Sequence, residues 1–145
     1  MSLAVEARVR ASFERQRVMA TFGCVLERVV PGEVTIRMPF REDLTQQHGF
    51  LHAGVVSTLV DSACGYAALS LMPEGAAVLS IEFKVNLLAP AKGEAIVARG
   101  KVVKAGRTVS VVSGEVFAVR DGQEHLCTTM VGTMMVVKDR PGLSD

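Results

Sequence analysis

One segment near the middle of the chain constrains its fold more than any other. Residues 53–72 are small or apolar, and Asp61 is the only charged residue between His52 and Pro73. This composition predicts a helix over about 54–71 that is apolar on every face. Such a helix is stable only when other elements enclose it. We therefore expect a buried central helix that carries one carboxylate at its middle.

A membrane-spanning helix is the alternative for a segment of this length. The abundance of Ala, Gly and Ser and the central Asp61 argue against it. The N-terminus lacks the uninterrupted apolar core of a secretory signal. Three cysteines, odd in number and without a CxxC pair, are typical of reduced thiols. We expect a cytoplasmic protein that does not associate with membranes.

The residues around the central segment predict an α+β fold. Alternating apolar and polar residues indicate a strand over 79–87, and Gly- or Pro-containing turns separate further strands near 94–104, 108–120 and 124–138. Two shorter strands are expected near 24–30 and 33–39, and apolar spacing predicts an N-terminal helix over about 3–20. The favoured architecture is a curved antiparallel sheet wrapped around one long helix. A single domain would span 1–145, with its core at about 22–138.

Composition excludes several function classes. The formal net charge is +1, with no Trp and one Tyr, which disfavours a nucleic-acid partner. His48 and His52 are four residues apart, but Gly49 intervenes and no third His or Cys converges, so no metal site is expected. The glycine-rich pieces do not match a phosphate-binding loop, and no cofactor is expected.

Asp61 admits two interpretations from burial alone, and they are equally good. A hydroxyl or a backbone N–H can satisfy a buried carboxylate as a purely structural group. Alternatively, the carboxylate performs chemistry, since burial disfavours ionisation and raises its pKa unless a neighbour stabilises the charge. The segment preceding the helix favours the second interpretation.

The run QQHGFLHAG from Gln46 to Gly54, followed by Leu59-Val60-Asp61, resembles the hotdog-fold acyl-CoA thioesterases, in particular their PaaI-like (phenylacetate-pathway) branch. The resemblance covers about residues 40–137, including Ser80 and the segment from Lys104 to Thr108. It implies the hotdog fold, hydrolysis of an acyl-CoA to the free acid and CoA, and a homodimer that pairs into a dimer of dimers. CoA would then be part of the substrate.

The same resemblance implies roles for individual residues. Asp61 matches the catalytic carboxylate, and Ala53 stands where the family has a Gly whose backbone N–H contacts the thioester oxygen. Gln46 occupies the position of an Asn that helps to place the attacking water. Ser80 is a weaker match to a Ser found in some members.

Four further residues are expected to bind substrate. His52 and Gly54 belong to the turn before the helix, where His52 is expected to bond backbone groups. Lys104 and Arg107 flank the Ala105-Gly106 turn, near which similar proteins bind the phosphates of CoA. Solvated surface charge is the equally good alternative for these two cations.

The spacing of Ala53 and Asp61 requires two subunits. Eight residues of helix span about 12 Å, whereas one thioester must lie within about 3 Å of both groups. Ala53 of one subunit should therefore meet Asp61 of the other. Asp61 as nucleophile and Asp61 as general base both remain open, as do aromatic and aliphatic acyl groups. A non-catalytic acyl-CoA-binding module and, less favoured, an acyl thioester dehydratase are the alternative functions.

Overall fold

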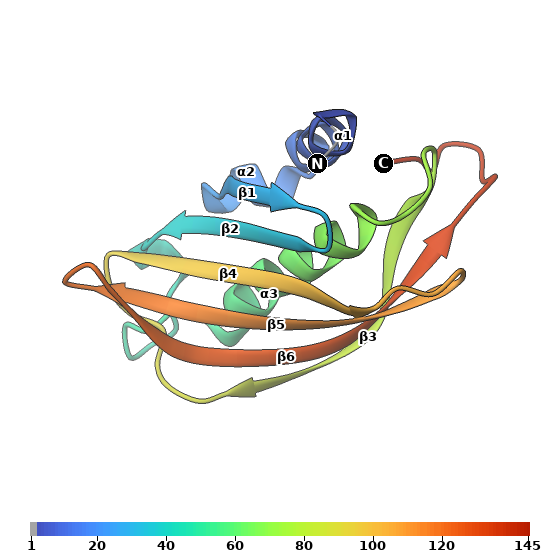
Figure 1. Cartoon of the computed structure of the whole chain (residues 1–145). Coiled ribbons are helices and arrows are strands. Elements are labelled where there is room, and N and C mark those ends of the chain that lie inside the picture. The colour runs from blue at the N-terminus through green and yellow to red at the C-terminus, as the bar shows by residue number, and fades with distance from the viewer. Residues whose placement is uncertain (1–2) are drawn as a thin grey trace.

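A computed structural model describes residues 3–145, which form a curved sheet, a central helix and an N-terminal helical segment (Figure 1). The helices are α1 Leu3–Arg15, α2 Arg17–Phe22 and α3 Ala53–Leu69, with a short 3₁₀ turn at Glu42–Leu44. The strands are β1 Val25–Val30, β2 Glu33–Pro39, β3 Ala77–Leu87, β4 Ala95–Lys104, β5 Val109–Arg120 and β6 Gln123–Val137. The predicted α+β architecture is confirmed.

The six strands form one antiparallel sheet in the order β1-β2-β4-β5-β6-β3. After α3 the chain crosses to the far edge, where β3 pairs with β6 and not with its sequence neighbour β4. The sheet curves in front of α3 in Figure 1. Strand β3 is therefore an edge strand, and its other side is unpaired among residues 3–145.

Two paired glycines let α3 lie directly on the sheet. Gly100 of β4 is the register partner of Gly114 of β5. A Cβ on Gly100 would collide with the backbone of Ala63, and one on Gly114 would come within 2.8 Å of Cys64 Sγ. The small residues of α3 thus meet a matching flat area at the middle of the sheet. This contact sets the distance between the middle of α3 and the sheet.

The N-terminal helical segment is divided, which the sequence pattern did not predict. Gln16 leaves helical geometry, with φ −78° and ψ 97°, and separates α1 from α2. The guanidinium of Arg8 ties α1 to the end of α3 by donating to the carbonyl oxygens of Leu69, Met72 and Pro73 at 2.7 to 3.0 Å. Cationic donors at this end also complement the helix dipole.

Strand β3 exposes large apolar side chains along the unpaired edge. Leu79, Ile81, Phe83 and Leu87 are each 43% to 56% exposed. A long apolar edge strand of this kind is a surface onto which another strand pairs readily. Across residues 3–145, no helix combines the length and the hydropathy needed to cross a membrane.

Candidate active site

The first turn of α3 presents one unused backbone donor. His52 is the N-cap residue, and its Nδ1 accepts a hydrogen bond from the N–H of Gly54 at 2.8 Å. The N–H of Ala53 takes part in none of the hydrogen bonds found among residues 3–145. Its φ is not positive, so the Ala methyl group is accommodated without strain. A free N–H at a helix N-terminus can stabilise a developing negative charge.

Gln46 shapes the turn that precedes α3. Its side-chain Oε1 accepts hydrogen bonds from the N–H groups of His48, at 2.6 Å, and Phe50, at 3.3 Å. Gly49 completes this turn at a φ of +84°, which favours glycine. Because the oxygen is occupied, the Nε2 of Gln46 is the part of the side chain that can contact a water or a substrate.

Ala53 and Gln46 share one cavity of about 370 Å³. The cavity lies between the start of α3 and the end of β3, and most of its lining is apolar. Phe50, Val56 and Leu87 contribute to its wall. An apolar lining strengthens a hydrogen bond from the Ala53 N–H to a carbonyl oxygen, because fewer water molecules compete for the donor.

Asp61 lies two turns further along α3 and faces the edge strand. The hydroxyl of Ser80, on β3, donates to Asp61 Oδ1 at 2.7 Å. Burial raises the pKa of Asp61 above its usual value of 3.8, and the hydrogen bond from Ser80 partly offsets this rise. A carboxylate with this balance can accept a proton more readily than an exposed one.

A second cavity, of about 270 Å³, contains Asp61 and Ser80. Ser12 and Gln16 of the N-terminal segment and Tyr66 of α3 also line it. The two proposed reacting groups of one chain therefore lie in separate cavities. They stand eight residues apart on one unbroken helix, about 12 Å along its axis.

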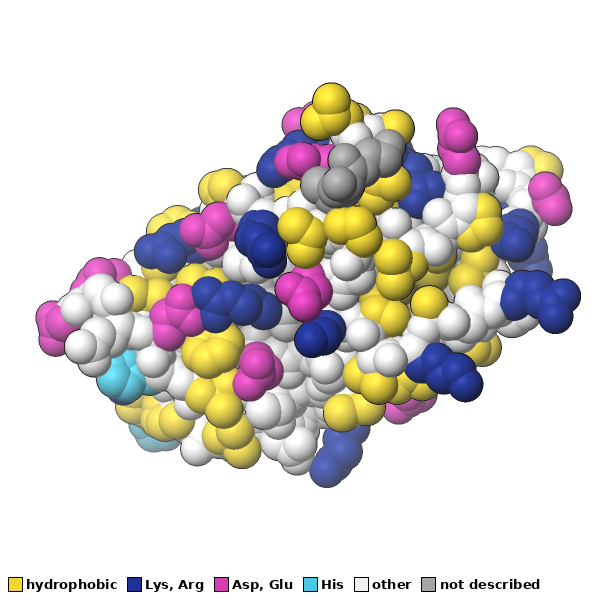
Figure 2. Space-filling model, in the orientation of Figure 1, with side chains coloured by type: hydrophobic (Ala, Val, Ile, Leu, Met, Phe, Trp, Pro, Cys, Tyr) yellow, Lys and Arg dark blue, Asp and Glu magenta, His cyan; other side chains and the backbone are white. Residues whose placement is uncertain are grey.

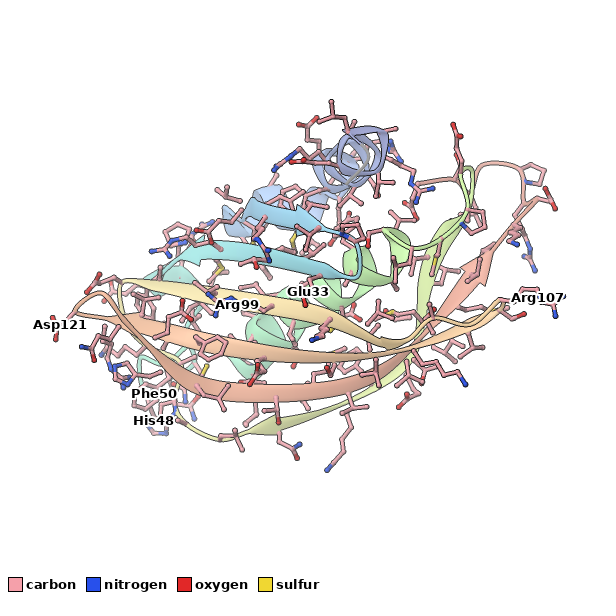
Figure 3. All side chains as sticks on the ribbon, viewed as in Figure 1. Glu33, His48, Phe50, Arg99, Arg107 and Asp121 are labelled. Carbon is pink, nitrogen blue, oxygen red and sulfur yellow. The ribbon has the colours of Figure 1, made fainter. Side chains whose placement is uncertain are left out.

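The two cations predicted to bind phosphate lie far from this chain's own helix start. Lys104 ends β4 and Arg107 follows it in the exposed turn before β5. In Figure 3 Arg107 is at the opposite end of the molecule from His48 and Phe50. A different cation, Lys92, lies beside the loop that precedes α3, with its Nζ 5.9 Å from the centre of the Phe50 ring.

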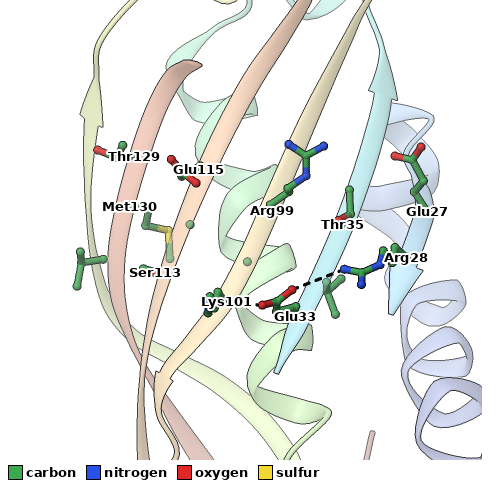
Figure 4. A pocket seen from close by; sticks show the side chains of 14 residues that line it. Glu27, Arg28, Glu33, Thr35, Arg99, Lys101, Ser113, Glu115, Thr129 and Met130 are labelled. Atoms are coloured by element: carbon green, nitrogen blue, oxygen red, sulfur yellow. Dashed lines mark ion pairs between the residues drawn. The ribbon is translucent and has the colours of Figure 1, made fainter. Parts of the chain in front are cut away.

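A larger hollow, of about 710 Å³, is on the face of the sheet that points away from α3 (Figure 4). Exposed side chains of opposite charge line it, and Glu33 forms ion pairs there with Arg28 and Lys101. Figure 2 shows basic and acidic groups interspersed across this face. The hollow contains none of the predicted catalytic residues.

Among residues 3–145, neither Cys64 nor a cluster of metal-ligating side chains forms a competing centre. Cys64 is buried, and burial together with the nearby Asp61 charge raises the pKa of its thiol to about 12, which keeps it protonated. Within residues 3–145, no group of three His, Cys, Asp or Glu side chains is arranged to hold a metal ion.

Comparison with known proteins identifies the family. Residues 48–125 match the family model described as "Thioesterase superfamily". The chain belongs to the thioesterase superfamily. A crystal structure of a thioesterase family protein from Silicibacter pomeroyi is 54% identical, with a TM-score of 0.92 over 93% of this chain and 99% of that one. Human acyl-coenzyme A thioesterase 13 is 37% identical over 84 residues, 57% of this chain and 59% of the relative.

The fold of this thioesterase extends to more distant proteins. The Escherichia coli PaaI protein from the phenylacetic acid degradation operon aligns with a TM-score of 0.82 over 97% of this chain and 95% of its own, at 20% identity. The resemblance predicted from the run before Asp61 is thus confirmed, and the chain is a thioester hydrolase with the hotdog fold.

Sequence patterns missed the polar residues Gln16, Ser62 and Tyr66, which line the Asp61 cavity of this thioesterase. Gln16 Nε2 donates to the hydroxyl oxygen of Tyr66 at 2.8 Å, and Ser62 Oγ donates to Gln16 Oε1 at 2.9 Å. One signal was available: Tyr66 is the only Tyr and lies in the apolar segment, where a buried hydroxyl needs a partner. Nothing in the sequence indicated that Gln16 would provide it.

Proposed function

We propose that the protein hydrolyses an acyl-CoA thioester to the free acid and CoA, in sites shared between two subunits. The observation that carries this proposal is that the donor and the carboxylate of one chain lie in separate cavities along α3. Each chain has an unused donor, the Ala53 N–H, in one cavity and a carboxylate, Asp61, in another. If two α3 helices ran antiparallel, the Ala53 N–H of each subunit would lie beside Asp61 of the other. The dimer would then have two equivalent sites.

The chemistry follows from these two groups. The Ala53 N–H of one subunit would polarise the thioester carbonyl and stabilise the oxyanion that forms on attack. Asp61 of the other would take a proton from a water, whose oxygen bonds to the carbonyl carbon. Collapse of the tetrahedral species then breaks the C–S bond, and the CoA thiolate receives a proton. Direct attack by Asp61, giving an anhydride that water then cleaves, uses the same groups.

Gln46 and Ser80 would support the reaction from either side. The free Nε2 of Gln46 can donate to the attacking water, while Ser80 orients the Asp61 carboxylate. His52 and Gly54 would hold the turn that presents Ala53 to the substrate. Lys104 and Arg107, on an exposed turn, would contact the CoA phosphates in the assembled enzyme. No cofactor beyond the CoA of the substrate is required.

The dimer would form through β3. Pairing of the two β3 edges would continue the sheet, cover the apolar side chains along that edge and run the two α3 helices in opposite directions. The family resemblance supports a further pairing into a dimer of dimers. The free cysteines support a cytoplasmic location.

Release of free thiol from a panel of acyl-CoAs tests this function. The panel should include phenylacetyl-, hydroxybenzoyl- and hexanoyl-CoA, since aromatic and aliphatic acids are both open. Asp61→Asn should lower the rate by about 10²- to 10⁴-fold. Asp121→Asn, in the exposed turn between β5 and β6, is the matched control and should leave the rate unchanged. Binding of acyl-CoA without thiol release would instead indicate a non-catalytic module.

A further inference from the structure

The segment after β6 returns to the start of β3 and binds to its open edge. The N–H of Asp145 donates to the carbonyl oxygen of Ala76 at 3.2 Å, and Asp145 Oδ2 accepts a hydrogen bond from the N–H of Val78 at 2.9 Å. A backbone N–H in a strand points toward one neighbouring strand only, so the N–H of Val78 is directed away from β6. Asp145 therefore lies on the side of β3 that no other strand among residues 3–145 covers. Figure 1 shows this tail folding back toward the start of β3.

Helix α1 holds the tail in this place. The hydroxyl of Ser12, a residue that is 5% exposed, donates to Asp145 Oδ1 at 2.8 Å. One turn further along α1, Arg15 donates to the carbonyl oxygen of Ser144 at 3.2 Å. Helix α1 is itself tied to the end of α3 through Arg8. The position of the tail on β3 is thus fixed relative to α3, the helix that carries both proposed reacting groups.

The tail divides the edge of β3 into a covered part and a free part. Ala76 and Val78 are hydrogen-bonded to the tail, and the N–H of Val78 has no second hydrogen to offer another strand. The exposed apolar side chains of the edge begin at Leu79, directly after the covered part, and continue to Leu87. The part of the edge on which another strand can form backbone hydrogen bonds is therefore residues 79–87, which we call the free edge.

We propose that Asp145 sets the register in which a second copy of this chain pairs with β3, and that it is thereby a positioning residue for the shared site. The proposal rests on the function proposed above. In a two-fold antiparallel pair, two identical edges align about one residue that faces its own copy. The free edge is symmetric about Phe83, so the two-fold axis passes beside this residue when the tail is in place.

The register matters because the reacting groups belong to different subunits. Without the tail, β3 can pair from residue 77 onward, and the axis of the longest pairing moves to Glu82. A shift of the axis by one residue moves the partner strand by two residues, which keeps every side chain on its own face. Two residues of strand span about 7 Å. The Ala53 N–H of one subunit would then move by about that distance relative to Asp61 of the other, whereas a thioester must lie within about 3 Å of both.

Disulfide formation between single introduced cysteines measures the register without depending on activity. With the tail intact, Phe83→Cys should crosslink the dimer at least about fivefold more than Glu82→Cys, because only residue 83 faces its own copy. Adding Asp145→Ala to each variant should reduce this preference at least about fivefold, since β3 can then also pair about residue 82. The parent chain, which carries only its three natural cysteines, gives the background. No preference with the tail intact, or an unchanged preference in Asp145→Ala, would overturn the proposal.

Activity and a conservative variant separate the hydrogen bonds of Asp145 from its charge. Asp145→Ala should lower kcat for thiol release at least about tenfold, because slipped dimers hold the reacting groups apart. Asp145→Asn should keep the crosslinking preference and most of kcat, since an amide can accept from the N–H of Val78 and donate to the hydroxyl oxygen of Ser12. Asp139→Asn is the control: this exposed tail residue has a φ of +55°, which Asn tolerates.

Three outcomes of these measurements are decisive. Equal losses in Asp145→Ala and Asp145→Asn would assign the effect to charge and overturn the proposal. Light scattering that shows monomers in Asp145→Ala would mean that the tail is needed for association and not for register, which also overturns it. Failure of the wild type to cleave any thioester would instead refute the proposed function, while the crosslinking preference would still decide the register.

Discussion

The Ser80 hydroxyl lies 2.7 Å from Asp61 Oδ1 and joins edge strand β3 to the middle of α3. This bond favours the ionised carboxylate, whereas burial disfavours it and raises the Asp61 pKa. Asp61 must be ionised to act as base or nucleophile. The rate should therefore rise with pH through the Asp61 pKa, falling about tenfold for each pH unit below it.

Ser80→Ala removes the group that lowers the Asp61 pKa. The pKa should then rise, and the acidic limb of the kcat/KM profile should move to higher pH. Ser113→Ala, on β5, is the matched control and should leave the profile in place. If Ser80→Ala scales the whole profile down without moving its limb, Ser80 orients Asp61 but does not tune its ionisation.

Sequence patterns predicted the helix at residues 53–69 and all six strands to within a few residues, because each strand alternates and each turn contains Gly, Pro or Asp. They did not predict that β3 crosses to the far edge of the sheet, since strand order depends on contacts distant in sequence. The break at Gln16 was also missed. The Gln16 side chain at this break bonds to Tyr66 and Ser62, contacts that the helical period of α1 does not encode.

The part of the candidate site formed by residues close together in the sequence was predictable. Asp61, Ala53 and Gln46 lie in one short stretch of sequence. The axial rise per residue of an α-helix separates Ala53 from Asp61 by too much for one chain to supply both groups, which was enough to infer two subunits. The hydrogen bonds that join Gln16 to Ser62 and Tyr66 beside Asp61 were not predictable, because these residues are distant in sequence.

Two glycine-to-alanine changes should have opposite effects on stability. Gly100→Ala forces a methyl group against the Ala63 backbone and should lower the free energy of unfolding by about 1–3 kcal/mol. Gly65→Ala meets no atom within 4 Å and should raise it by about 0.5–1 kcal/mol. Urea denaturation at one fixed protein concentration measures both, since dimerisation contributes to apparent stability. Equal losses would show that Gly65 is also needed for packing.

A charge on the β3 edge should weaken the dimer. Phe83 is 43% exposed on this strand, and Phe83→Lys would put a cation into the shared edge from both subunits at once. We expect the dimer dissociation constant to rise at least about tenfold, or ~1.4 kcal/mol, with thiol release lost at the same protein concentrations. Val25→Lys, at a 59% exposed position on the opposite edge strand β1, is the control. Dissociation by Val25→Lys alone would assign the contact to β1.

Complementation between two inactive variants tests the shared site directly. Proline is favoured at the first position of a helix, and His52, with φ −58° and ψ 139°, already has a backbone geometry that a following proline allows. Ala53→Pro should therefore keep α3 while removing the unused N–H. The Ala53→Pro and Asp61→Asn homodimers should each be inactive.

Mixing and refolding the two variants in equal amounts gives mixed dimers as half of the total. If each site combines Ala53 of one subunit with Asp61 of the other, every mixed dimer has one intact site. Thiol release should then recover to about a quarter of the wild-type rate. If both groups came from the same chain, every site in the mixture would carry one defect and no activity would return. Circular dichroism of the Ala53→Pro homodimer checks that its loss of activity is not a loss of fold.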